Sequence, residues 1–436
     1  MAEKIYKIKG GKKLEGEIEL AGAKNVATKV IIASLLSKEK SILENIPEIG
    51  DVEITLKMCE SLGAKYKWLD KNVLEIEPSL KDYKVPFEYS GKNRVPILFF
   101  GPLLHRFKKA EIPIVGGCQI GQRPVDFHIN GYQFLGAKIV YQDNVYFASC
   151  DKLKGATIEL QYPSVGATEN LILGAVLAEG TTVIKNAAIE PEIEDLVLFL
   201  QSMGAIIYQD VNRTWIVEGK KELKGTTFRI MNDRIEAASF ASLAIANKGN
   251  IFIKGIDPKV ISTFLNYVRK IGADFKLFKN GIRFYNSFPL KGVAVETDVH
   301  PGFMTDWQPP FSIVLTQAEG VSIVHETVYE NRFGYVSALN KMGAKIYLFT
   351  NCLGSKSCRF CYHDFPHSAI IVGPTILKGK ELEVPDLRAG FSYLIASLIA
   401  VGESTVRGIE KIERGYERIK ERLKNIGAEI EEEVRT

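Results

Sequence analysis

The chain has 436 residues, of which 46% are hydrophobic and 25% are charged. This length exceeds one typical domain and the composition is that of a globular protein, which excludes a disordered chain, a collagen and a fibrous repeat. Lysine and arginine total 56 against 52 acidic residues, and so small an excess does not indicate a nucleic-acid partner.

The sequence predicts no secretory or membrane segment. Residues 1–13 contain no apolar stretch before a small-residue cleavage site, and the apolar run 393–401 is too short to cross a bilayer. Six cysteines in a chain of this length favour a reducing compartment over a disulfide framework. We therefore expect a soluble cytoplasmic protein without a membrane partner, and the sequence leaves its oligomeric state unknown.

An apolar residue followed by Gly-Ala recurs along the whole chain. In each copy the glycine follows an amphipathic run and precedes an alternating, β-rich run, as expected where a left-handed glycine ends a helix before a strand. This pattern predicts six copies of one unit. The spacings are 73, 68, 68, 71 and 84 residues, between Gly63, Gly136, Gly204, Gly272, Gly343 and Gly427.

Upstream of each glycine lies a second helix candidate with little charge, which we expect to be buried. β-Rich segments such as 181–187, 250–256 and 404–409 connect the two helices of a unit. Three such units can share one closed core, so the six predict two lobes. The longer last spacing indicates an insertion at 351–367. The six candidates for buried helices are 25–36, 95–104, 168–178, 236–246, 311–317 and 391–401.

Basic side chains stand at or near the predicted helix starts. A cation there opposes the helix dipole unless an anion lies between them. Their recurrence predicts a site for a multiply charged anionic substrate, whereas the alternative is solvated surface charge. For Ser164, Asp233 and Asp386, an ordinary N-cap is the favoured interpretation. The basic residues are Lys24, Arg94, Arg123, Arg332, Arg388 and Arg414.

A glycine-rich segment, GGCQIGQRPVDFH, carries one cysteine beside an arginine. The glycines predict a mobile loop that holds Cys118 near Arg123. A loop thiol near cations can act as an acid or as a nucleophile. The alternative is an incidental free cysteine.

Eight ordered motifs resemble the UDP-N-acetylglucosamine enolpyruvyl transferase (1-carboxyvinyltransferase) family over nearly the whole chain. The resemblance implies an α/β fold of two lobes, each an inside-out α/β barrel of three βαβαββ repeats. It implies a first lobe of residues 23–233 with the cysteine loop, and a second lobe of 1–22 with 234–436, which carries the catalytic aspartate and the insertion. The motifs are GAKN (22–25), GGCQIGQRPVDFHI (116–129), PSVGATEN (163–170), NAAIEPEIEDL (186–196), HPGFMTDWQ (300–308), ETVYENRF (326–333), DLRAG (386–390) and RGYERI (414–419).

The reaction that this resemblance implies is transfer of the enolpyruvyl group of phosphoenolpyruvate to the sugar 3′-hydroxyl of UDP-N-acetylglucosamine, with release of phosphate and without metal or organic cofactor. It begins peptidoglycan precursor synthesis. Cys118 would be the general acid and Asp306 would deprotonate the hydroxyl. Lys24, Arg123 and Arg414 would hold phosphoenolpyruvate, with Arg332 and Arg388 as further partners.

The same resemblance implies a set of contacts to the sugar nucleotide, in which helix N-termini meet the diphosphate. Tyr162 departs from the family, because some members carry lysine there. Pro96, after Arg94, fits only a first helical turn, and prolines 309–310 stand where a plain helix is expected. The implied contacts are Asn25, Arg94, Arg123, Pro124, Val125, Asp126, Phe127, Tyr162, Pro163, Ser164, Val165, Gly166, Asp306 and Val328.

The insertion has the spacing Cys-x-x-Cys-x-His-x-x-x-His, which can ligate zinc, although a loop of structural thiols is favoured. Its candidate ligands are Cys352, Cys358, Cys361, His363 and His367.

Two alternative functions stay open. One is an enolpyruvyl transferase with another acceptor, such as 5-enolpyruvylshikimate-3-phosphate synthase. That enzyme would need serine beside the lysine in place of GAKN, and no cysteine loop. The other alternative is a non-catalytic paralogue that binds UDP-sugars.

Overall fold

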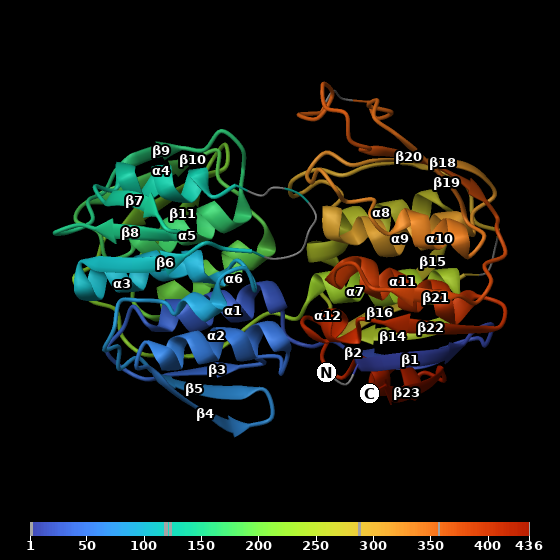
Figure 1. The fold of residues 1–436 in the computed structure, drawn as a ribbon, viewed down its shortest axis with the longest axis horizontal. Helices are drawn as coiled ribbons and strands as arrows, with labels where there is room; N and C mark the ends of the chain where they lie inside the picture. Colours follow the sequence, from blue (N-terminus) through green and yellow to red (C-terminus); the bar gives the residue numbers. More distant parts are fainter. Residues whose placement is uncertain (1–2, 117–120, 122–123, 287–288, 356–357, 436) are drawn as a thin grey trace. The chain divides into compact units, whose positions relative to one another are not determined.

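The computed structural model describes residues 3–116, 121, 124–286, 289–355 and 358–435 (Figure 1). They form two compact units, each with its own hydrophobic core. Among the described residues, the first unit consists of residues 22–116 and 124–231, and the second of residues 3–21, 121, 232–286, 289–355 and 358–435.

The first unit has three sheets with one strand pattern, in which a strand runs parallel to its neighbour and the next two pairings are antiparallel. In one sheet the parallel strand is reduced to a bridge between Lys84 and Glu111. The sheets are, in spatial order, β13 (Thr227–Arg229), β3 (Ser41–Glu44), β5 (Val73–Glu77) and β4 (Lys65–Asp70); β9 (Thr157–Glu159), β10 (Thr181–Lys185), β12 (Thr214–Glu218) and β11 (Ile206–Asp210); and β6 (Lys109–Pro113), β8 (Val145–Ser149) and β7 (Lys138–Gln142).

The second unit repeats this pattern in three sheets of four strands. They are β2 (Glu15–Glu19), β14 (Asn250–Lys254), β16 (Gly281–Tyr285) and β15 (Asp274–Phe278); β17 (Ala294–Glu296), β18 (Gly320–His325), β20 (Ser368–Gly373) and β19 (Lys345–Phe349); and β21 (Glu381–Glu383), β22 (Glu403–Arg407), β1 (Glu3–Lys9) and β23 (Glu429–Arg435).

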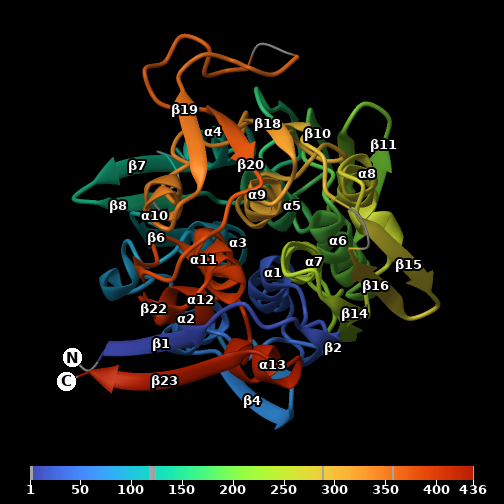
Figure 2. The ribbon, with the colours of Figure 1, turned by 90° about the vertical axis from the view of Figure 1, so that its right-hand side faces the viewer.

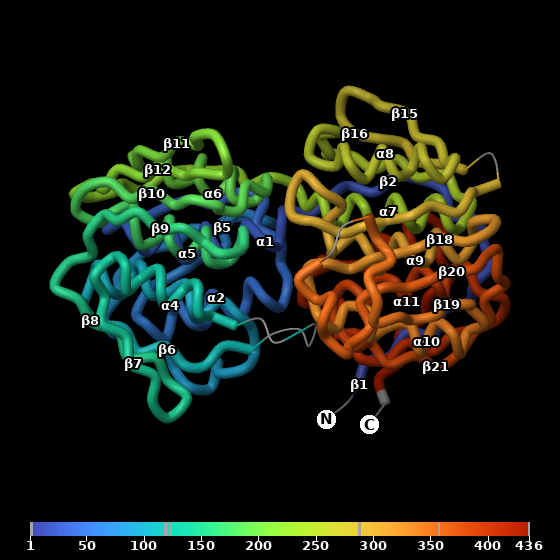
Figure 3. The backbone as a smooth tube through the Cα atoms, turned by 90° about the horizontal axis from the view of Figure 1, so that it is seen from above, coloured from blue at the N-terminus to red at the C-terminus, as the bar shows by residue number. Residues whose placement is uncertain are grey.

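Each repeat places one helix in the core of its unit. Every residue of α7 and of α9 is buried, because beyond the first turn, which holds Arg234, Glu236 and Gln308, their residues are apolar or small on all sides. In the second unit α7, α9 and α11 contact one another, and Figure 3 shows them close together. The core helices are α1 (Lys24–Ser34), η2 (Val95–Phe99) leading into α3 (Phe100–Phe107), α5 (Val165–Ala175), α7 (Arg234–Ala246), α9 (Gln308–Thr316) and α11 (Leu387–Ile399).

A second, outer helix in each repeat ends at one of the six repeated glycines. All six glycines have φ between 80° and 106°, a conformation that favours glycine and stops a helix. The prediction of six βαβαββ repeats, three in each lobe, is confirmed. The outer helices are α2 (Gly50–Ser61), α4 (Asp126–Phe134), α6 (Pro191–Ser202), α8 (Ser262–Lys270), α10 (Val336–Lys341) and the pair α12 (Ile409–Glu413) and α13 (Ile419–Asn425); short 3-10 turns are η1 (Phe87–Tyr89), η3 (Pro258–Ile261) and η4 (Thr305–Trp307).

The N-terminal segment supplies two strands to the second unit. β1 lies between β22 and β23 and is antiparallel to both, and β2 lies at the edge beside β14. Ile5, Tyr6 and Ile8 of β1 are buried in the core. Figure 2 shows β1 and β23 side by side. None of the helices in the described part of the chain is long and apolar enough to span a membrane.

Candidate functional site

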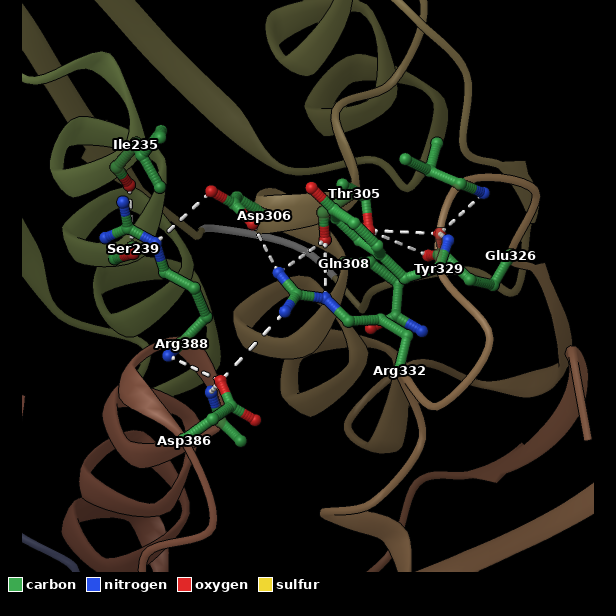
Figure 4. Close-up of polar contacts among 12 residues, drawn as sticks. Ile235, Ser239, Thr305, Asp306, Gln308, Glu326, Tyr329, Arg332, Asp386 and Arg388 are labelled. Carbon is green, nitrogen blue, oxygen red and sulfur yellow. Dashed lines mark hydrogen bonds and ion pairs between the residues drawn. The ribbon is translucent and has the colours of Figure 1, made fainter. Parts of the chain in front are cut away.

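Asp306 lies in η4, immediately before α9, and two buried arginines hold its carboxylate (Figure 4). Arg332 Nη2 donates to Oδ1 at 2.5 Å, and Arg388 Nε lies 3.4 Å from Oδ2. The arginines are 3% and 4% exposed, whereas the Asp306 side chain keeps 18% of its surface. The carboxylate is therefore fixed but still accessible.

Arg332 is oriented by the backbone of the same turn. Its Nε and Nη2 both donate to the carbonyl oxygen of Thr305 at 3.3 Å, and its Nη1 lies 4.0 Å from Asp386 Oδ1. Burial acts to lower the pKa of Arg332, but Asp306 and Asp386 outweigh it and the pKa is raised. Arg332 therefore stays charged and keeps the carboxylate in place.

The guanidinium of Arg388 has a donor that makes no hydrogen bond to the described residues. It lies in the first turn of α11, which Asp386 caps by accepting the Arg388 backbone N–H at 2.9 Å. The guanidinium lies 5.5 Å from the Tyr416 ring centre. Among the described residues its buried Nη1 has no hydrogen-bond partner. A buried donor of this kind is normally satisfied, so an anionic ligand is a suitable partner for Arg388.

Glu326 shapes the neighbouring turn. Its buried carboxylate accepts the Thr305 hydroxyl at 3.0 Å and the backbone N–H groups of Val328 and Tyr329 at 2.9 and 3.0 Å. Burial raises its pKa, and Arg332 acts against that rise. Glu326 thereby fixes the backbone at Val328. One sign of this residue can be found in the sequence, its position as the first residue of the motif ETVYENRF.

Arg414 is the C-cap residue of α12, and its side chain is half-buried. It follows Glu413 and precedes Tyr416, whose ring lies against Arg388. In the second unit the structure therefore brings Asp306, Arg332 and Arg388 into direct contact. It places Arg414 two residues before Tyr416.

In the first unit Lys24 begins α1 and forms an ion pair with Asp51. The Lys24 Nζ lies 2.8 Å from Asp51 Oδ2, with 17% and 6% of the two side chains exposed. Asn25 follows in the first turn, which has neither an acidic residue nor a side-chain cap. Sequence reasoning missed Asp51, and its only signal is an acid in the first turn of α2.

Arg94 contacts the segment that precedes α4. Its Nη2 donates to the carbonyl oxygen of Pro124 at 3.3 Å. Asp126 begins α4, where a negative charge is favourable. Val125 and Phe127 are half-buried against the core of the first unit. The structure thus brings Arg94 to the predicted run 124–127.

The N-terminus of α5 holds the second predicted run, 162–166. Ser164 caps the helix by accepting the Ala167 N–H at 3.4 Å, and its own N–H donates to the Tyr162 carbonyl oxygen at 2.7 Å. Tyr162, Pro163, Val165 and Gly166 are half-buried. Free N–H groups at this helix start can bind a phosphate.

A buried network ties α4 to α5. His128 Nδ1 lies 3.0 Å from Asn170 Nδ2, and the Tyr132 hydroxyl donates to the Asn170 carbonyl oxygen at 3.0 Å. A Cβ added at Gly166 would lie 3.5 Å from His128 Cε1. The runs 124–127 and 162–166 are therefore held next to each other within the first unit.

Cys118 and Arg123 lie outside the described residues. The side chains that can hold a metal form one group in the described chain, and no expected catalytic or substrate-binding residue belongs to it. The group differs from the spacing-based prediction, since Cys361 and His363 are outside it and a histidine of β18 is within it. Its members are His325, Cys352, Cys358 and His367.

Comparisons with known proteins give one family. The family model described as EPSP synthase (3-phosphoshikimate 1-carboxyvinyltransferase) matches residues 8–423. The chain is 51% identical to a protein of Protochlamydia amoebophila, over 98% of this chain and 94% of that protein. It is 48% identical to one of Chlamydia abortus (97% and 96%) and 40% identical to one of Halothermothrix orenii (98% of each). All three carry the name UDP-N-acetylglucosamine 1-carboxyvinyltransferase.

Solved structures share the fold at lower identity. The enolpyruvyl transferase NikO from Streptomyces tendae matches over the full length of both chains, with a TM-score of 0.88 and 20% identity. EPSP synthase from Acinetobacter baumannii matches 99% of this chain and 100% of its own, with a TM-score of 0.73 and 19% identity. The predicted fold class is confirmed by these likenesses.

Proposed function

This chain belongs to the family of EPSP synthase-type enolpyruvyl transferases, and from that premise we propose that it transfers the enolpyruvyl group of phosphoenolpyruvate to UDP-N-acetylglucosamine. The product would be the 3-enolpyruvyl ether of the sugar nucleotide, with phosphate released. This is the reaction in the names of relatives at 40–51% identity, and it begins peptidoglycan precursor synthesis. The observation in the structure that carries the proposal is the fixed, accessible carboxylate of Asp306 between two buried arginines.

The proposed chemistry is addition followed by elimination. The sugar 3′-oxygen attacks the central enol carbon as Asp306 takes the hydroxyl proton, and Cys118 gives a proton to the methylene carbon. The Cys118 thiolate then takes a proton back from the new methyl group as the C–O bond to phosphate breaks, and the proton held by Asp306 leaves with the phosphate. Atoms and charge balance without a metal or redox group.

The cations would stabilise the negative charge of phosphoenolpyruvate and of the tetrahedral intermediate. We assign this role to Lys24, Arg123 and Arg414, with Arg388 as a further partner. The spare Nη1 donor of Arg388 supports its assignment. Arg332 is already bound to Asp306 and to the Thr305 carbonyl oxygen, so we assign it the positioning of the carboxylate.

For the sugar nucleotide, we assign the diphosphate to the N-terminus of α5, at Ser164, Val165 and Gly166. The cap at Ser164 leaves other N–H groups of the first turn available. Val328 would contact the nucleotide through its backbone, which Glu326 holds. The remaining assignments are Asn25, Arg94, Pro124, Val125, Asp126, Phe127, Tyr162 and Pro163.

A coupled phosphate-release assay with phosphoenolpyruvate tests the function. We expect turnover with UDP-N-acetylglucosamine and none with shikimate 3-phosphate, and mass spectrometry should find the enolpyruvyl ether in an amount equal to the phosphate. Turnover with shikimate 3-phosphate alone would replace the proposed acceptor. Binding of UDP-N-acetylglucosamine without phosphate release would instead indicate a non-catalytic protein.

The role of Cys118 is tested with fosfomycin, an epoxide analogue of phosphoenolpyruvate. The proposal expects alkylation of Cys118 and of no other cysteine. Cys118→Asp should keep turnover and abolish labelling, because aspartate donates a proton but attacks the epoxide poorly. Labelling of Cys59 or Cys150 in place of Cys118 would remove Cys118 from the mechanism.

A further inference from the structure

The insertion after β19 brings two thiols to two buried imidazoles. Cys352 and Cys358 lie in the loop, His367 immediately precedes β20, and His325 is the last residue of β18. β18 and β20 are paired with His325 opposite Ser368, and the Glu326 N–H donates to the His367 carbonyl oxygen at 2.8 Å. One ligand atom from each of the four side chains lies within 4.8 Å of the others.

Two distances between these ligand atoms match tetrahedral coordination. The Cys352 and Cys358 sulfurs are 3.5 Å apart, and Cys352 Sγ lies 3.4 Å from His367 Nε2. Zinc bonds of about 2.3 Å to sulfur and about 2.0 Å to nitrogen place tetrahedral ligand atoms roughly 3.3–3.8 Å apart. A disulfide would need an S–S distance of about 2.05 Å, so the two thiols are not bonded to each other.

Both imidazoles are oriented as metal-ligating histidines are. His325 Nδ1 lies 3.1 Å from Glu296 Oε2, and its buried Nε2 has no hydrogen-bond partner among the described residues. His367 Nδ1 lies 3.1 Å from the Phe365 carbonyl oxygen, so its Nε2 is the nitrogen that faces Cys352. A carboxylate or carbonyl behind the ligating ring is the usual arrangement in metal sites. Both rings are fully buried.

The loop backbone is shaped around the same group. The Phe360 N–H donates to Cys358 Sγ at 3.3 Å, and the Ser355 N–H donates to Glu296 Oε2 at 2.8 Å. A Cβ at Gly354 would lie 1.8 Å from Glu296 Oε2 and 2.0 Å from His325 Nδ1. Only glycine fits there, because the loop passes directly over the pair that orients His325.

We propose that His325, Cys352, Cys358 and His367 form a structural zinc site that fastens the insertion to the sheet of β18 and β20. Two thiolates and two imidazoles suit zinc, and four protein ligands leave no open position for catalysis. Sequence spacing did not predict this set because one ligand comes from a strand before the insertion. The Cys-x-x-Cys pair, Cys358 and Cys361, contributes only its first member.

The test uses the full chain, produced with added Zn²⁺ and purified under reductant. We expect about one zinc per chain by plasma mass spectrometry. Replacement by Co²⁺ should give the intense visible bands of tetrahedral cobalt together with thiolate charge-transfer absorption. Cys358→Ser should lose the metal, whereas Cys361→Ser, a matched change three residues away, should retain it.

Glu296→Gln provides a variant with all four ligands intact. It should weaken Zn²⁺ binding about 10–100-fold, the usual effect of removing a carboxylate behind a ligating histidine. If Cys358→Ser fails to fold, the Zn²⁺ affinity of Glu296→Gln tests the proposed zinc site in its place. The proposal is overturned if the wild-type chain binds no stoichiometric zinc, if Cys361→Ser loses as much metal as Cys358→Ser, or if the zinc-supplemented protein carries a Cys352–Cys358 disulfide.

Discussion

Asp306→Asn separates the charge of this residue from its shape. We expect turnover to fall at least about 100-fold, because asparagine cannot accept the hydroxyl proton. Two buried arginines also lose their anionic partner, which should lower the free energy of unfolding by about 1–3 kcal/mol. Phosphate release and thermal unfolding measure the two effects, and binding of UDP-N-acetylglucosamine should change little.

Asp386→Asn is the matched control for Asp306. Asparagine caps α11 as well as aspartate does, and Arg332 loses only a carboxylate 4.0 Å away. This variant should keep most of the turnover. Near-normal turnover in Asp306→Asn, or an equal loss in both variants, would move the base to another residue.

Glu169 makes the stability of the chain depend on pH. Burial raises the pKa of Glu169 to about 7 from an ordinary 4.5, although Lys29, whose Nζ lies 3.6 Å from Glu169 Oε2, acts to lower it. Between these values the folded chain holds a proton that the unfolded chain has released, so stability falls as pH rises. Relative to Glu169→Gln, the wild type should lose about 3 kcal/mol between pH 5 and pH 8.

Denaturant unfolding at several pH values measures this difference, and other titrating groups cancel between the two proteins. Parallel pH profiles for the wild type and Glu169→Gln would refute a raised Glu169 pKa.

Side-chain pairs were the part of the candidate site that sequence could not predict. Lys24 and Asp51 lie on different helices, as do Asp306 and Arg388, and each side chain alone looks like a solvated charge. The motifs singled out Asp306 and the arginines as residue types. Only the fold reveals that Arg332 and Arg388 bind the carboxylate itself, so their expected role towards substrate stays a prediction.

At the scale of elements, the need for glycine at the repeated position can be tested by substitution with alanine, which adds a single methyl group. Gly136 ends α4 with φ of 93°, and nothing lies within 4 Å of an added Cβ. Gly136→Ala should therefore lower the free energy of unfolding by about 1–2 kcal/mol through backbone strain alone. Denaturant unfolding measures this change in the free energy of unfolding.

Gly334→Ala is the control, since its Cβ would meet only Asn331 Oδ1 at 3.9 Å and its φ is not positive. We expect its stability to be unchanged or slightly raised, because alanine restricts the unfolded chain. Equal effects of the two substitutions would mean that φ at Gly136 carries no strain.

The repeat was predictable because its signals are local: an amphipathic run, a glycine and an alternating run. The residues at which helices begin were less predictable. The sequence predicted a core helix from residue 311, but α9 begins at Gln308 because prolines fit a first turn, where no N–H is needed. Pro96 fits the first turn of η2 for the same reason.

At the scale of the whole molecule, the two units differ in how the chain builds them. All three sheets of the first unit come from residues 22–231, whereas the second unit needs β1 and β2. A fragment of residues 22–231 should unfold cooperatively on heating. Residues 232–436 alone should not, because one sheet lacks an interior strand and another lacks its parallel edge strand.

A joined fragment provides the control. The Asp233 N–H donates to the Ala21 carbonyl oxygen at 2.9 Å, so a short glycine linker can connect residues 1–21 to 232–436. This fragment should recover cooperative unfolding by circular dichroism. Cooperative unfolding of 232–436 without the linked strands would contradict the requirement for them.

The position of β1 between β22 and β23 also sets an order of events during synthesis. β1 is synthesised about 400 residues before β22 and β23, the two strands that pair with it. Until those two strands are made, the backbone donors and acceptors of β1 lack their native partners, and such an exposed strand is prone to pair with other chains. The first unit can fold in this interval, as complete domains do while synthesis continues. The second unit can close only after β22 and β23 have been made, so a nascent chain that stalls before them carries one finished unit and one exposed strand.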